Sequence, residues 1–318
     1  MLPLPLHPPV AMRVIDLARS GLNDPADPWE TPGTEADLRA YGSMRRAAYA
    51  FIPADFASPE LPEGAVDTLA AAVGPLTPGS VILLPQTPRS IGPKDWVVTP
   101  ACVLGIGADA LALWVAGPHG GIAARIPFAE VVAVIDLTVL LFGRLEIVGP
   151  EGSIVLRYNT VGRAEIRAAL EVVRRSWASG AAVRGAPAGP SPDALPHKWM
   201  ALLRSGEVAP RDTEPRLVAA GDVANPRASR RNGLAVLCRT EFTTVTEPDL
   251  AAGLGGYGMD LVAIPRVRLA SLSAAKDGLE VRVEAGRADV ALRIPAHASL
   301  VTATAARIGP AVTGAAAT

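Results

Sequence analysis

Short runs of Val, Ile and Leu fill residues 76–158 and again residues 216–295, and Gly, Pro, Asp and Asn separate them. Such runs, bounded by turn residues, are typical of antiparallel strands in a sandwich or barrel. The most apolar stretch is interrupted by Asp136, Arg144 and Glu146. It is therefore too short and too charged to span a bilayer. We predict strands in both regions and no transmembrane segment.

A period of 3.6 residues replaces the strand pattern at several places and predicts helices there. These segments are 10–22, 34–51, 64–74, 162–178, 197–207 and 296–309. The clearest is 162–178, where Ile166, Leu170, Val173 and Trp177 fall on one face. The three N-terminal helices are short, so we expect them to pack on the first strand-rich region rather than form a core of their own.

The two strand-rich regions resemble each other. "ARIPFAEVVAVI" aligns with "VAIPRVRLASLS", Leu145 with Leu279, and Leu156 with Leu292. Solenoid repeats recur every 20–50 residues or so, and this period is far longer. We therefore predict one β-rich unit present in two copies, each folding around its own apolar interior.

The pattern divides the chain into five parts. We predict a helical N-terminal region (1–75), a first β-rich domain (76–178), an Ala/Gly/Pro linker (179–196), a second β-rich domain (197–309) and a flexible tail (310–318).

Composition narrows the class of protein. The chain is 49% hydrophobic and 19% charged, with a formal net charge of -1. It can therefore bury real cores, and it has no global basic field that would attract nucleic acid. The N-terminus is broken by prolines and makes a poor secretory signal. Cys102 and Cys238 are expected to be small buried side chains, with a disulfide between them left open. We expect a cytoplasmic protein.

The order of strands and helix resembles a known family. "VLGIGADALALWV", "IPFAEVVAVI", "RLEIVG" and "AEIRAALEVVRR" follow the pattern of bacterial pleckstrin-homology-like (PH-like or GRAM-like) domains. The resemblance covers residues 80–177 and, less well, 215–308. It implies a mainly β (α+β) fold with two antiparallel barrels in tandem, each closed by a C-terminal helix, behind the short helical N-terminal region.

The resemblance also implies where a ligand could bind. Family members that bind phosphoinositides carry basic residues in the loop between the first two strands. The matching positions here are Arg89 and Lys94 in the first copy, and Arg227, Arg230 and Arg231 in the second. Clustered guanidinium groups can hold an anion, although a solvated loop in an Arg-rich protein has the same composition. Tyr257, at the tip of "GLGGYG", is a further candidate contact residue.

Motifs for catalysis and cofactors are incomplete. "GLGGYG" fits G-x-G-x-x-G but lacks the preceding strand and following helix that dinucleotide binding needs. "GPHGG" lacks the G-x-S-x-G nucleophile motif of esterases. No His pair has metal-ligand spacing, so we expect no catalytic residue, metal or cofactor.

We expect a non-catalytic interaction or scaffold protein that binds a protein partner. Two alternatives stay open. One is binding of an acidic lipid headgroup or anion at the membrane surface, with the chain peripheral at the inner membrane. The other is an enzyme of unrecognised type with a site between the two domains.

Overall fold

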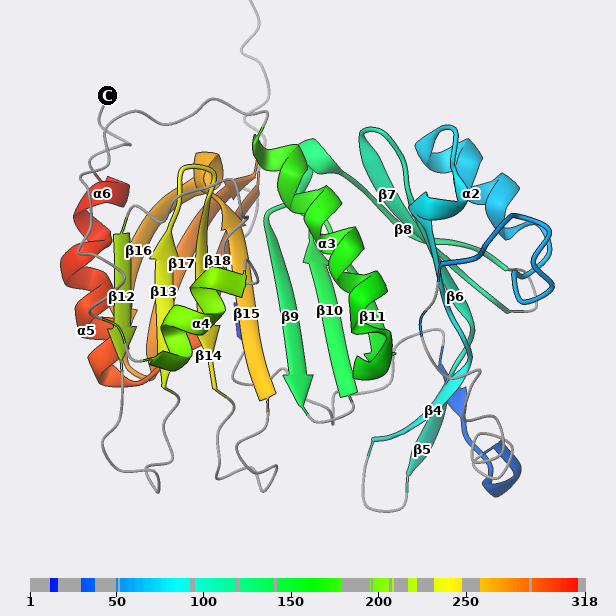
Figure 1. The fold of residues 1–318 in the computed structure, drawn as a ribbon, viewed down its shortest axis with the longest axis horizontal. Helices are drawn as coiled ribbons and strands as arrows, with labels where there is room; N and C mark the ends of the chain where they lie inside the picture. The colour runs from blue at the N-terminus through cyan, green and yellow to red at the C-terminus, as the bar shows by residue number, and fades with distance from the viewer. Residues whose placement is uncertain are drawn as a thin grey trace, which may run out of the picture.

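The protein is mainly β, with helices on the outside of its sheets (Figure 1). In the computed structural model, the described residues are 12–16, 30–37, 50, 52–91, 95–117, 120–139, 142–178, 195, 197–205, 208, 217–221, 232–247, 258–285 and 288–313.

The first copy of the repeat, residues 81–178, has a meander of four strands, a 3-10 turn, a meander of three strands and a helix. Its elements are β3 (Val81–Leu84), β6 (Cys102–Ile106), β7 (Ala110–Val115), β8 (Gly121–Pro127), η2 (Phe128–Glu130), β9 (Ala133–Val139), β10 (Phe142–Val148), β11 (Ser153–Asn159), η3 (Thr160–Gly162) and α3 (Arg163–Ala178). A hairpin of β4 (Thr87–Ser90) and β5 (Trp96–Thr99) is inserted after β3 and pairs with β2 (Thr31–Pro32).

The second copy, residues 217–307, repeats this order. Its elements are β12 (Leu217–Gly221), β13 (Gly233–Leu237), β14 (Glu241–Thr246), β15 (Gly258–Pro265), η6 (Arg266–Arg268), β16 (Leu269–Ala275), β17 (Gly278–Ala285), β18 (Ala288–Pro295) and α5 (Ala298–Arg307).

The likeness of the copies extends to single hydrogen bonds in their turns. Gly107 N donates to Ala110 O at 2.8 Å in the first copy, and Cys238 N donates to Glu241 O at 2.8 Å in the second. At the start of η2, Phe128 N donates to Asp109 O at 2.7 Å, and at the start of η6, Arg266 N donates to the equivalent Thr240 O at 2.8 Å. The repeat predicted from the sequence is thus confirmed in strand order and in turn geometry.

One sheet runs through both copies. Its strand order is β11-β10-β9-β15-β14-β13-β12, and β9 and β15 pair antiparallel from Val139↔Gly258 to Val134↔Ala263. The other sheets are β3-β6-β7-β8 and β1-β18-β17-β16, with the small β2-β5-β4 sheet beside them. Among the described residues no sheet closes into a barrel. The expectation that each copy folds around an apolar interior of its own is therefore wrong, because β9 of the first copy and β15 of the second pair in one sheet.

Strand β9 explains why the copies are joined. Val134 packs in the first copy's apolar core, whereas Ile135 and Leu137 pack in the second copy's core. A strand buried on both faces carries apolar residues on both of them. The Val-rich run that resembled a barrel strand in the sequence thus belongs to a strand lying between two cores.

Helices cover both parts of the long sheet on one face (Figure 1). α3 packs its predicted stripe, Ile166 to Trp177, into the first core, and α4 (His197–Ser205) buries Trp199 against β12–β14. α2 (Ala65–Val73) buries Leu69 on the outer face of β3, β6 and β7. The helices predicted at 64–74, 162–178 and 197–207 are confirmed, with small differences at their ends.

The ends of the chain differ from the prediction. Residues 13–16, expected within a helix, form β1 (Arg13–Asp16), which pairs in parallel with β18. Ile15 packs against the second core, so tertiary contact decides against the helical pattern. Beyond α5, α6 (Gly309–Thr313) includes residues 310–313 of the predicted flexible tail, and Val312 there is buried.

A candidate binding pocket at the junction of the two copies

The site residues predicted from the sequence lie almost entirely outside the described residues. Those outside are Lys94, Arg227, Arg230, Arg231 and Tyr257. Arg89 has a described backbone, which pairs with Val97 in the β4–β5 hairpin. The sequence placed it in a loop, and this part of the prediction is wrong. Its side chain lies outside the description.

The structure instead forms a pocket where the two copies meet. Its volume is about 430 Å³. Three parts of the first copy line it: the β6–β7 turn, η2 and the end of α3. The end of β15 and η6 of the second copy form the other wall. The lining residues are Ala108, Asp109, Phe128, Ala129, Ser176, Trp177, Pro265, Val267 and Arg268.

Equivalent turns of the two copies form this pocket. Each follows an Ile-Pro pair that ends a strand, at Pro127 and Pro265. Proline has no N–H for the sheet and holds φ near -65°, which favours a strand end followed by a turn. The next residue of each turn points inward, so Phe128 and Arg266 are buried. The following residues face out, and Val267 is 55% exposed.

The end of α3 supplies the floor on the first copy's side. Trp177 is buried with the first core, and its indole Nε1 has no hydrogen-bond partner among the described residues. The neighbouring Ser176 Oγ donates to Val173 O at 2.6 Å. The hydroxyl is thus held by the helix, and the wall beside it is largely apolar.

Arg268 gives the second copy's wall a positive charge. Its Nη1 donates to Glu284 O at 3.4 Å, and it forms no ion pair within the described part of the chain. Burial lowers the pKa of this guanidinium from its ordinary value, and the Glu130 carboxylate opposes that effect. An arginine remains charged under both influences. Asp109, on the first copy's side, is the acidic residue of the lining.

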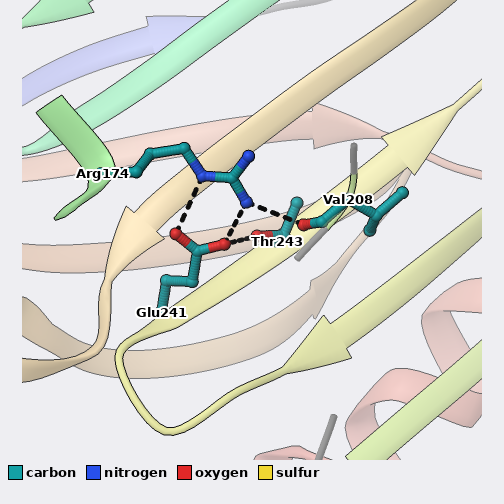
Figure 2. Close-up of polar contacts among 4 residues, drawn as sticks. All are labelled: Arg174, Val208, Glu241 and Thr243. Carbon is teal, nitrogen blue, oxygen red and sulfur yellow. Dashed lines mark hydrogen bonds and ion pairs between the residues drawn. The ribbon is translucent and has the colours of Figure 1, made fainter. Parts of the chain in front are cut away.

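A buried ion pair fixes the two walls relative to each other (Figure 2). Arg174 of α3 donates through Nε to Glu241 Oε2 of β14 at 3.0 Å, and through Nη2 to Glu241 Oε1. Nη2 also donates to Val208 O at 2.9 Å, and Thr243 Oγ1 donates to Glu241 Oε1 at 2.9 Å. Such a satisfied buried pair is rigid, because breaking it leaves a charge without compensation. The end of α3 is thereby held against the second copy.

None of the pocket residues was predicted from the sequence as a site residue. The Ile-Pro pair, which marked the repeat, was the available signal, because it predicts a strand end and an exposed turn in each copy. That the two turns face one pocket follows only from the pairing of β9 with β15, a contact between residues far apart in the sequence.

The pocket combines largely apolar walls with two charged side chains. The described lining contains no histidine, and it includes the hydroxyl of Ser176 and the carboxylate of Asp109. The described part of the chain contains no group of His, Cys, Asp and Glu residues that could hold a metal ion. Cys102 and Cys238 are buried, form no disulfide with each other, and lie in separate apolar clusters. Apolar walls with a few polar or charged groups are typical of ligand-binding and active sites alike.

Searches for relatives give no further guide. Within the described residues, no helix has both the length and the apolar character needed to cross a membrane. Comparison of the chain with protein-family models, with curated proteins and with solved structures finds no match.

Proposed function

We propose that this chain is a non-catalytic interaction protein, built from two fused PH-like modules, that binds a protein partner in the cytoplasm at the junction pocket. The order of four strands, three strands and a closing helix in each copy supports the PH-like assignment. Shared strand pairing makes the two modules one body, so a partner meets a single composite surface.

One observation carries the proposal. The two equivalent turns and the end of α3 form a largely apolar pocket, and an apolar side chain, Val267, stands exposed at its rim. Exposed apolar residues grouped with a charged residue around a concave site are typical of surfaces that bind other proteins. The lining offers the apolar and charged contacts of a binding surface.

The test is affinity co-purification from cells that produce the protein, with quantification of what is recovered. Val267→Asp places a carboxylate on the pocket rim and should reduce partner recovery at least about tenfold, because binding would bury a charge without a partner. Val161→Asp is the matched control, because Val161 is 60% exposed in η3, away from the pocket. Both variants should unfold at the wild-type temperature.

Equal recovery with wild type and Val267→Asp would contradict the proposal. A parallel sedimentation with phosphatidylserine vesicles separates it from lipid binding. Vesicle binding that persists in Val267→Asp, without any partner protein, would favour the acidic-headgroup alternative.

A further inference from the structure

We infer that the junction pocket recognises an extended segment of the partner in which an acidic side chain directly follows a large apolar one. This inference rests on the proposed function and names the chemistry that the same pocket selects. The apolar side chain would lie against Phe128, Trp177 and Val267, and the acid would pair with Arg268.

The lining first selects an apolar anchor. Two aromatic rings, a proline and a valine face the space, and both aromatic residues are held by the first core. Side chains fixed in this way form a site whose shape exists before binding, which lowers the entropic cost of association. A volume of about 430 Å³ accepts one large side chain with its neighbours.

Arg268 then selects a negative charge beside the anchor. It is the one positive residue in the described lining, and its own contact is a single long hydrogen bond to a backbone carbonyl. A half-buried guanidinium without an ion pair gains a charge-assisted, bidentate contact when a carboxylate arrives. Asp109 lines the pocket, and the Glu130 carboxylate acts on Arg268. Repulsion from these two negative charges disfavours a second acidic residue in the bound segment.

The source of the carboxylate follows from the kind of donor. C-terminal carboxylates are typically captured by consecutive backbone N–H groups. Around η6, the N–H of Arg266 donates to Thr240 O and that of Leu269 to Arg266 O, so these two groups are not offered to a ligand. The donor offered here is a side-chain guanidinium on an open rim, which suits an acidic side chain within a continuous segment.

Three peptides test the inference on the full-length protein. Ac-Ser-Gly-Phe-Glu-Gly-Ser-NH2 carries the apolar–acidic pair, and the second peptide replaces Glu with Gln. The third, Ac-Ser-Gly-Phe with a free carboxyl end, supplies the charge from the terminus. Binding is followed by methyl NMR shifts of Val267 and Ala129 and by calorimetry.

The Glu peptide should bind about fivefold tighter than the Gln peptide, in line with one charge-assisted contact. Arg268→Gln should remove this preference, while Arg282→Gln, an exposed arginine of β17, should retain it. Raising the salt concentration should shrink the preference in wild type and leave Arg268→Gln unchanged.

Equal affinity for the Glu and Gln peptides would overturn the inference, and so would the absence of binding of any peptide at about 5 mM. Tighter binding of the third peptide would also overturn it, in favour of a chain terminus. In each case the proposed function still stands if Val267→Asp reduces partner recovery, so the two failures can be told apart.

Discussion

β8 and β15 occupy the same place in the two copies, but their outer edges meet opposite surroundings. β15 pairs along its edge with β9 over Gly258–Ala263, and most of its residues are buried. β8 ends its sheet, and Ile122 is 37% exposed there. Equivalent strands thus have different roles: β15 pairs the second copy with the first, whereas β8 is an edge strand of its described sheet.

The sequence differs where the use of the edge differs. The pairing of β8 with β7 shifts register between Leu113 and Trp114 of β7, which leaves Ala123 of β8 as an extra, bulged residue. Arg125 follows, and its Nε donates to Ala72 O at the end of α2, at 2.8 Å. β15 has no shift, and Ala263 stands where β8 has Arg125. Bulges and exposed charges are common protection of open edges, and β8 carries both, whereas β15 has no bulge and its one charged residue, Asp260, is buried.

The largest effect on this comparison should come from Arg174→Ala, which removes the cation that ties α3 to β14. Glu241, fully buried, would lose its ionic partner. We expect a loss of about 3–5 kcal/mol in the free energy of unfolding. Urea denaturation measures it, and a joint Arg174→Met, Glu241→Leu variant should recover much of the loss. A loss below about 1 kcal/mol, the range of an exposed pair, would show that the pair does not hold the copies together.

The next effect should come from Ala263→Arg, which moves the protective charge of β8 onto β15. Ala263 is buried in the first core, so a guanidinium there would be both too large and unpaired. We expect about 3 kcal/mol of destabilisation. Chemical denaturation gives the value, and hydrogen exchange at β9 and β15 should rise most. Unchanged exchange there would contradict the role of this pairing.

Tyr158→Phe should have a medium effect and tests a polar contact that the second copy lacks. Tyr158 Oη donates to the buried Asp136 Oδ1 at 2.5 Å, where the second copy has Ile294 and Ala274. Removing the hydroxyl should cost about 1–3 kcal/mol near neutral pH, because the carboxylate loses a donor.

The same variant has a pH signature. Burial, with help from Asp136, raises the pKa of Tyr158 far above its ordinary value. The contribution of Tyr158 is therefore complete below about pH 10, the unfolded pKa, and declines above it. The stability difference between wild type and Tyr158→Phe should shrink by up to about 1.4 kcal/mol per pH unit above that point. A difference that grows with pH would contradict this assignment.

The smallest effect on stability should come from Arg125→Ala, which weakens the protection of β8. We expect a change below about 1 kcal/mol, since the side chain is exposed. Deleting Ala123 as well should restore a regular edge and increase self-association. Light scattering across a concentration series checks this, with Arg282→Ala on β17 as the control. An unchanged monomer fraction would show that the bulge and charge do not protect the edge.

Much of the fold could be predicted from the sequence because it depends on local patterns. The stripe from Ile166 to Trp177 predicted α3, and the turn residues between apolar runs predicted the antiparallel strands. The correspondence of Leu145 with Leu279 placed the copies in register. These signals lie within short segments, where periodicity and turn chemistry act directly.

The rest depended on contacts between distant residues. Val10, Val14 and Leu17 have the spacing of a helix in the sequence. Pairing with β18 nevertheless fixes Arg13–Asp16 as strand β1. Val134 and Ile135 face different cores, which no periodicity can distinguish from a strand of a closed barrel. The pocket also depends on contacts between distant residues, because its turns are brought together by the pairing of β9 with β15.

The two faces of β9 have a consequence for how the protein comes apart. Because alternate side chains of one strand belong to different cores, neither copy can melt without exposing apolar surface of the other. The duplicated chain should therefore denature in a single cooperative step. A protease nick between residues 178 and 197 should leave two fragments that co-elute rather than two free-standing domains.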